Sequence, residues 1–212
     1  MVPPWAQSGS DLTRLLALSD GIFAFAMTLL VLGLALPAAF DPTSVGRVLV
    51  NLRPAFLAYA LSFFVIWFYW LGHTQIFTYI VSFDRRLQQL NVTFLLFIAV
   101  MPFVTNLLSA ANGQFLTVVL YAGNQIAAGG TLTLIWVYAT GERRHVPRSL
   151  PEGWVNYVAV RSSVGPIVFA ASIPIALVNP VWAEFSWVSL FIFQALVRSI
   201  HRRGPGGTGE GG

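Results

Sequence analysis

The chain has 212 residues, of which 56% are apolar and only 9% are charged, against roughly 25% charged residues in an average soluble domain. Twelve basic and eight acidic residues are too few to cover a soluble protein of this size. The composition therefore excludes a disordered chain, a nucleic-acid-binding arm and an ordinary cytosolic enzyme. The net charge is +4, and all twelve basic residues are arginines. Cysteine is absent, which excludes disulfides and thiolate metal sites. With a mean hydropathy of +0.71, the sequence predicts an all-α membrane protein with the lipid bilayer, and no nucleic acid, as its surroundings.

Six stretches are long and apolar enough to cross a membrane, which takes roughly 20 mainly apolar residues. In chain order they are Leu15–Leu36, Pro54–Ile80, Leu87–Leu108, Phe115–Ala139, Trp154–Val178 and Val181–Ile200. Only two residues separate the last two, which predicts a tight antiparallel hairpin. We expect one six-helix transmembrane domain over residues 1–203, and a disordered glycine-rich tail over residues 204–212.

The arginines predict how the chain is oriented, because basic residues favour cytoplasmic loops. Nine of them fall on one side of the predicted spans: Arg14, Arg85, Arg86, Arg143, Arg144, Arg148, Arg198, Arg202 and Arg203. Arg47 and Arg53 fall on the other side. This bias predicts a multi-pass protein of the cell membrane with both termini in the cytoplasm, as an even number of spans requires.

Three ionisable side chains interrupt the apolar stretches, where such groups are costly and usually functional. Asp20 lies in the first span, and His73 lies near the end of the second, within reach of Asp20 or of Asn91 at the start of the third. One interpretation is a structural polar network; the other is a proton relay, which would suit a proton-coupled secondary transporter. Arg161 lies in the fifth span, and its long side chain can extend to the cytoplasmic interface.

No catalytic, cofactor or metal motif is present in the sequence. The other histidines, His145 and His201, lie in predicted loops, and there is no H-x-x-x-H pair. Nucleophile elbows, P-loops and zinc-protease helices are absent too. We therefore expect neither an enzyme nor a bound cofactor.

An apolar stripe runs along the first span, with residues at positions i, i+4, i+7 and i+11. It consists of Phe25, Leu29, Leu32 and Leu36, with Thr28 at its edge. Such a stripe, taken alone, is typical of a surface that faces lipid or a core. Around a symmetry axis, the same residues would form apolar rings that gate by dewetting, and one ring of hydroxyls. The Thr28 hydroxyl can also bond the carbonyl of Ala24, one turn back.

The first half of the chain resembles a known family. Arg14-x-x-x-Leu18-Ser19-Asp20, followed by an apolar run, resembles the R-x-x-x-F-S-D motif that opens helix one of the transmembrane protein 175 potassium channels. Those are the endolysosomal channel and its bacterial relatives. The segments 70–73 and 91–102, W-x-x-H and NVTFLLFIAVMP, resemble the second and third helices of that family. Leu18 departs from the motif, which has phenylalanine there.

The resemblance implies a subunit of six helices and, because the chain holds one copy of the motif, a homotetramer in which helix one lines a central pore. It implies a moderately selective potassium channel that passes Na⁺ or H⁺ less readily and lacks the T-V-G-Y-G filter. Carried over by position, the constriction falls on Phe25, with Leu29 and Leu32 as further gate residues, and selectivity falls on Thr28. Phenylalanine departs from the isoleucine or leucine of the family.

We also expect six polar residues to gather at the cytoplasmic end of helix one and to hold that helix in place. They are Arg14, Ser19, Asp20, Trp70, His73 and Asn91. If Asp20 is a buried charge in this network, its removal should cost about 3–5 kcal/mol.

Overall fold

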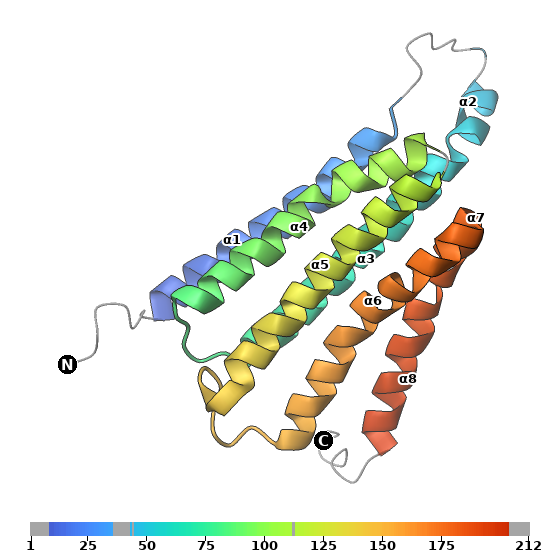
Figure 1. Cartoon of the computed structure of the whole chain (residues 1–212). Helices are drawn as coiled ribbons and strands as arrows, with labels where there is room; N and C mark the ends of the chain where they lie inside the picture. Colours follow the sequence, from blue (N-terminus) through green and yellow to red (C-terminus); the bar gives the residue numbers. More distant parts are fainter. Residues whose placement is uncertain (1–8, 36–42, 44, 112, 204–212) are drawn as a thin grey trace.

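The computed structural model describes residues 9–35, 43, 45–111 and 113–203, and the regular structure in these ranges is helical. Apolar runs form helices because a backbone in lipid must satisfy its hydrogen bonds internally. The long helices run side by side and are connected at their two ends (Figure 1). In chain order the elements are α1 (Gly9–Leu29), η1 (Leu30–Gly33), α2 (Val45–Asn51), α3 (Arg53–Thr78), α4 (Arg85–Ala110), α5 (Phe115–Thr140), η3 (Gly141–Arg143), α6 (Glu152–Val178), α7 (Pro180–Ser186) and α8 (Ser189–Arg203).

Among the residues that the structure describes, five helical segments are long and apolar enough to cross a membrane. They are Leu12–Gly33, Arg53–Thr78, Arg85–Ala110, Phe115–Arg143 and Glu152–Val178. Each coincides with one of the first five predicted stretches, so the prediction of an all-helical, multi-pass membrane protein is confirmed at this level.

The sixth predicted stretch, Val181–Ile200, is divided between α7 and α8, which has only 15 residues. The break lies at Trp187, whose amide bonds to the carbonyl three residues back at 3.1 Å. Its indole ring stacks on Tyr121 of α5 with a centroid distance of 4.8 Å and donates a hydrogen bond to Ser172 of α6 at 3.0 Å. Packing on two other helices thus fixes a bend that the apolar run does not reveal. Beyond the bend, α8 returns alongside α6 (Figure 1).

The centre of the bundle is formed by α4 and α5, which pack against each other; α1 and α3 cover α4, and α6 covers α5. One buried core lies where α1, α3 and α4 meet, and it includes Phe23, Ile66 and Phe94. A second core, around Tyr121 and Phe169, joins α5 to α6 and α7. Every long helix therefore buries one side, while large apolar side chains on the other side stay exposed, as in a protein surrounded by lipid.

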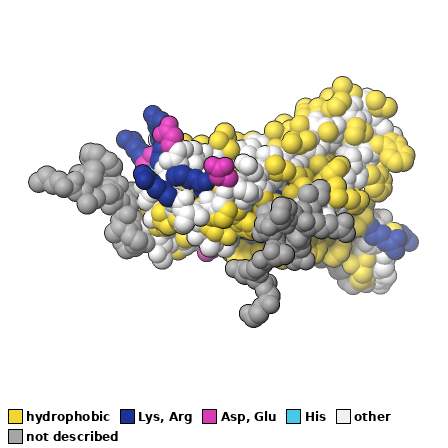
Figure 2. Space-filling model, turned by 90° about the horizontal axis from the view of Figure 1, so that it is seen from below, with side chains coloured by type: hydrophobic (Ala, Val, Ile, Leu, Met, Phe, Trp, Pro, Cys, Tyr) yellow, Lys and Arg dark blue, Asp and Glu magenta, His cyan; other side chains and the backbone are white. Residues whose placement is uncertain are grey.

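One end of the bundle carries the start of α1, the α3–α4 and α5–α6 connections and the end of α8 (Figure 1). This is the end where the sequence places nine of the arginines. Viewed from it, basic and acidic side chains gather on one part of the surface, and hydrophobic side chains cover much of the remainder (Figure 2). The glycine-rich tail predicted over residues 204–212 lies outside the described residues.

Candidate functional site

Helix α1 buries one face against α3 and α4 and leaves the opposite face uncovered. The buried positions of α1, and of the turn η1 that continues it, are Leu15, Ser19, Phe23, Ala26 and Leu30. Their exposed positions include Leu18, Gly21, Phe25, Thr28 and Leu32. Phe25 is 64% exposed and Leu32 is 67% exposed, whereas Phe23, on the buried face, is 1% exposed. This apolar face has no partner among the described residues of one subunit, so it must meet lipid or another chain.

The predicted stripe on the first span agrees only in part with this exposed face. Phe25 and Leu32 lie on the face, Leu29 is half-buried, and Leu36 lies outside the described residues. Thr28, expected at the edge, is exposed between Phe25 and Leu32. Successive residues of an α-helix are about 100° apart. Leu29, which directly follows the exposed Thr28, is therefore turned toward its own subunit.

The Thr28 hydroxyl donates to the carbonyl oxygen of Phe25 at 2.8 Å, and not to that of Ala24 as the sequence suggested. The side chain has adopted the rotamer that reaches three residues back instead of four. A hydroxyl has one donor and two acceptor lone pairs. Because the proton is held by the backbone, the Thr28 oxygen is left to accept from water or to contact a cation.

A buried hydrogen-bonded chain joins three helices behind the exposed face. Asn91 of α4 donates its amide to Ser19 of α1 at 3.1 Å and bonds through Oδ1 to Nε2 of His73 of α3 at 2.8 Å. All three residues are at most 1% exposed. Since the Asn91 amide nitrogen is directed at Ser19, His73 is the donor in the second bond. The His73 ring also stacks on Phe77 and Phe94, with centroid distances of 4.3 and 5.7 Å.

Asp20 and Trp70 form a separate contact beside this chain, with Trp70 Nε1 donating to Asp20 Oδ1 at 2.8 Å. Asp20 itself is exposed in the single subunit. The cost of about 3–5 kcal/mol expected for its removal applies to a buried charge and is too high for an exposed one. Hydrogen bonds to charged groups stabilise by about 1.5–3 kcal/mol, so the loss should not exceed that range. Arg14 is also exposed, and within the described ranges no hydrogen bond or ion pair links it to the other five residues.

Arg161, whose side chain was expected to extend toward the interface, donates from NH1 to Oε1 of Gln75 on α3 at 2.7 Å. No local sequence pattern predicts this pair, because 86 positions separate its members.

A second polar cluster, which sequence reasoning missed, joins the α3–α4 and α5–α6 connections. Asp84 caps α4 by accepting from the Leu87 amide at 2.8 Å, and it accepts from the Tyr138 hydroxyl at 2.5 Å. The buried His145 Nε2 lies 3.6 Å from Asp84 Oδ2. The Arg144 guanidinium lies over the Tyr138 ring, 4.7 Å from its centroid. The only sequence sign of this cluster was that Asp84 directly precedes a helix.

We expect acidification to loosen this cluster first through His145. Burial lowers the pKa of His145 below its usual 6.5, and the positive charge of Arg144 adds to this effect, while Asp84 opposes it. A lowered pKa favours the neutral form in the fold. Its contribution to stability is therefore present above pH 6.5 and is lost as the pH falls further. Burial alone would raise the pKa of Asp84, but the hydrogen bonds from Tyr138 and Leu87 and the nearby His145 lower it. The contribution of ionised Asp84 to stability is therefore present above pH 3.8 and is lost as the pH falls further below that value.

Hydrogen exchange of the segments 81–87 and 141–150, corrected for intrinsic rates, should therefore accelerate between about pH 7 and pH 5. In His145→Gln this acceleration should disappear, because the titrating group is gone. An identical pH dependence in the variant would contradict the assignment to His145.

The uncovered face of α1 and the hydrogen-bonded series of Ser19, Asn91 and His73 behind it lie in the part of the sequence that matches a known family. The sequence pattern of the family described as endosomal/lysosomal potassium channel TMEM175 matches residues 14–102. A potassium channel of Streptomyces collinus is 27% identical over 170 residues, which are 78% of this chain and 82% of that protein. A potassium channel of Chamaesiphon minutus is 29% identical over 182 residues, which are 84% of this chain and 89% of that protein.

Solved structures share the fold. The crystal structure of a lysosomal potassium-selective channel TMEM175 homolog from Chamaesiphon minutus superimposes with a TM-score of 0.76 and 26% identity, covering 88% of this chain and 97% of that one. A variant of the potassium channel MtTMEM175 superimposes with a TM-score of 0.62 at 18% identity, which shows the fold alone. The endosomal/lysosomal proton channel TMEM175 of Gallus gallus is 34% identical over 104 residues, 21% of its length. With the family pattern on residues 14–102 and relatives aligned over most of its length, the chain is similar in sequence and fold to the TMEM175 potassium channels.

Proposed function

We propose that this chain is a potassium channel that works as a homotetramer, with α1 lining a central pore. The observation that carries the proposal is the uncovered apolar face of α1, which is interrupted by one hydroxyl at Thr28. Four copies arranged around an axis would cover this face and turn each exposed position into a ring. The names of the relatives, which are potassium channels, support the choice of ion.

The rings suggest how such a pore would select. Phe25 would form the apolar neck, with Leu32 as a second apolar ring and Leu29 packed behind them. An apolar neck penalises ions that hold their water tightly, and K⁺ holds its water less tightly than Na⁺. The Thr28 oxygen, whose proton is donated to the Phe25 carbonyl, would replace part of the lost hydration with one oxygen per subunit.

Replacing Thr28 with valine should lower the K⁺/Na⁺ permeability ratio while leaving the tetramer intact, because valine keeps the shape of threonine and removes only the oxygen. The measurement is the reversal potential in planar bilayers under bi-ionic K⁺/Na⁺ conditions. Thr93→Val is the matched control: Thr93 is also exposed and donates to its own helix, at Gln89, with a distance of 2.9 Å, but it lies on α4. An unchanged ratio in Thr28→Val would remove Thr28 from the selectivity site.

The proposed subunit has six crossings and both termini in the cytoplasm, with α7 and α8 together forming the sixth. From Pro180 to Arg203 the chain has 24 residues in two helices that meet at the bend, and a crossing takes roughly 20 residues.

A reporter enzyme that is active only outside the cytoplasm, fused after residue 203, should therefore stay inactive, whereas the same reporter inserted between α2 and α3 should be active. The reverse pattern would overturn the assignment of the cytoplasmic side.

The function itself is tested with purified protein in liposomes. We expect K⁺ efflux that needs no proton gradient, and a molar mass of four chains by light scattering. The alternative, a proton-coupled secondary transporter that uses Asp20 and His73, requires flux driven by a pH gradient. If His73→Ala abolishes such flux while Phe25→Ala and Thr28→Val change nothing, the transporter interpretation replaces the channel.

A further inference from the structure

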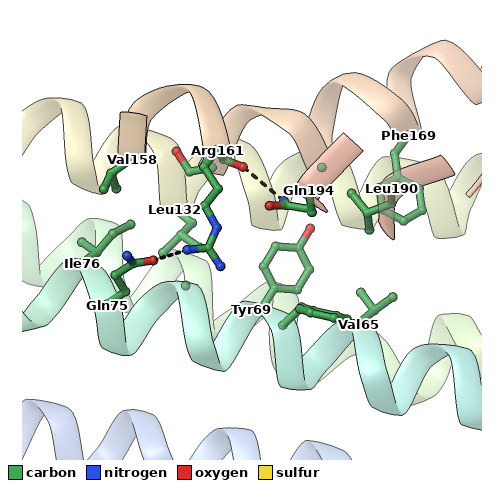
Figure 3. A pocket seen from close by; sticks show the side chains of 14 residues that line it. Val65, Tyr69, Gln75, Ile76, Leu132, Val158, Arg161, Phe169, Leu190 and Gln194 are labelled. Carbon is green, nitrogen blue, oxygen red and sulfur yellow. Dashed lines mark hydrogen bonds between the residues drawn. The ribbon is translucent and has the colours of Figure 1, made fainter. Parts of the chain in front are cut away.

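A small cavity lies between α3 on one side and α6 and α8 on the other, and α1 lies beyond α3 (Figure 3). Its volume is about 80 Å³, several times the roughly 10–15 Å³ that one water molecule needs on the same measure. It therefore has room for a polar group larger than a single water molecule. Its walls are mainly apolar, formed by Val65, Ile76, Leu132, Val158, Phe169 and Leu190.

A guanidinium faces this cavity from α6. Arg161 extends across the gap to Gln75 (Figure 3), and that bond occupies one of its five N–H donors. Arg161 is half-buried, and within the described ranges no carboxylate pairs with it. The guanidinium thus donates to a neutral amide, which leaves its charge without a counter-ion among the described residues, in a region where an unpaired charge is costly.

The position along the helices places this charge near the lipid headgroups. Arg161 lies nine residues from the start of α6, about 14 Å along a helix of about 40 Å. Its side chain reaches Gln75, three residues from the end of α3. The backbone of Arg161 therefore lies inside the hydrocarbon layer of about 30 Å, and its guanidinium extends toward the edge of that layer.

An unpaired acceptor lies beside this donor. Gln194 of α8 donates Nε2 to the Arg161 carbonyl at 3.2 Å, which fixes the orientation of its amide. Its Oε1 is buried and has no hydrogen-bond partner. A group that fills the cavity should therefore offer a negative oxygen to Arg161 and a hydrogen-bond donor to Gln194.

We propose that this cavity binds the headgroup of an anionic phospholipid that carries a hydroxyl, of the phosphatidylglycerol type. The phosphate accepts from the free N–H groups of Arg161, and a glycerol hydroxyl donates to Gln194 Oε1. The acyl chains lie outside, along the apolar surfaces of α3 and α8 that form the rim. An ethanolamine headgroup fits less well, because its ammonium would stand close to the guanidinium.

The test is a lipid titration of the purified, delipidated full chain by native mass spectrometry. The probes are phosphatidylglycerol, phosphatidylethanolamine, phosphatidic acid and inorganic phosphate. The wild type should prefer phosphatidylglycerol to phosphatidylethanolamine. Arg161→Gln should weaken phosphatidylglycerol binding about tenfold or more, because a charge-assisted bond is lost. Arg148→Gln, which removes an exposed arginine from a loop, is the charge-matched control and should bind like the wild type.

Two further arms separate the parts of the site. Gln194→Leu should weaken phosphatidylglycerol by roughly fivefold and leave phosphatidic acid, which has no headgroup hydroxyl, unchanged. Arg161→Lys keeps the charge without the planar fork and should bind with intermediate affinity, which preserves the test if Arg161→Gln does not fold. The proposal is overturned if phosphatidylglycerol binds equally to the wild type and the Arg161 variants, if Arg148→Gln loses as much, or if millimolar inorganic phosphate displaces the lipid.

Discussion

Replacing Phe25 with alanine is expected to raise both K⁺ and Na⁺ flux through the proposed pore by roughly tenfold, which corresponds to lowering the barrier by about 1.4 kcal/mol. The aromatic ring is 64% exposed in the subunit, so its loss should change the free energy of subunit unfolding by no more than about 0.5 kcal/mol. A wider neck lets both ions keep more of their water, so the K⁺/Na⁺ ratio should fall as the flux rises. Both quantities can be measured in proteoliposomes and planar bilayers.

Phe185→Ala is the matched control for this substitution. Phe185 is 65% exposed, almost the same fraction as Phe25, but it lies on α7. Flux through this variant should equal that of the wild type. If Phe25→Ala leaves both ion fluxes unchanged, or if Phe185→Ala raises them equally, the neck does not lie at Phe25.

Replacing Asn91 with leucine should produce the largest loss of stability among the substitutions considered. Asn91 is fully buried and bonds both Ser19 and His73. Leucine has a similar size but can make neither bond, and it leaves the His73 ring nitrogen without an acceptor. Interhelical hydrogen bonds in membranes average about 0.6 kcal/mol and reach about 1.7 kcal/mol. The two lost bonds together with the unpaired nitrogen should therefore lower the free energy of unfolding by about 2 kcal/mol.

The measurement is thermal unfolding in detergent, followed by the loss of the monodisperse peak. Thr93→Val, two residues further along α4, is the control, because the Thr93 hydroxyl is exposed and bonds only to its own helix. It should unfold like the wild type. Equal thermal stability of Asn91→Leu and the wild type would mean that the buried chain does not hold α1 to α3 and α4.

The extent to which the sequence predicted the fold depends on the range of the interactions involved. Long apolar runs predicted the first five spans because length and composition alone decide whether a helix can cross a membrane. The bend at Trp187 could not be predicted, since it depends on a stack with Tyr121, which is distant in sequence. The seven-residue helix α2 was missed because its sequence is not distinguished from that of the loop around it.

The candidate site was predictable to a similar degree. Ser19, His73 and Asn91 could be singled out because they are polar residues in apolar stretches, and the structure brings them into contact. The face that α1 leaves uncovered was predicted with an error of one position, at Leu29, because spacing gives the period of a stripe but not which of two adjacent stripes is covered. The contact of Arg161 with Gln75 depends on how α6 lies across from α3, which no local pattern encodes.

The attachment of α1 to α3 and α4 has a mechanical consequence for the proposed tetramer. Asn91 bonds α1 at Ser19, and Leu15, Phe23 and Ala26 are buried along the same face, so a tilt of α3 and α4 would carry α1 with it. Under four-fold symmetry, the gap between opposite subunits would change by twice the displacement of one helix. In the proposed tetramer, the radius of the neck would therefore be determined on the buried face of α1, by residues that do not touch the ion, and the chemistry of the neck by the residues on its exposed face.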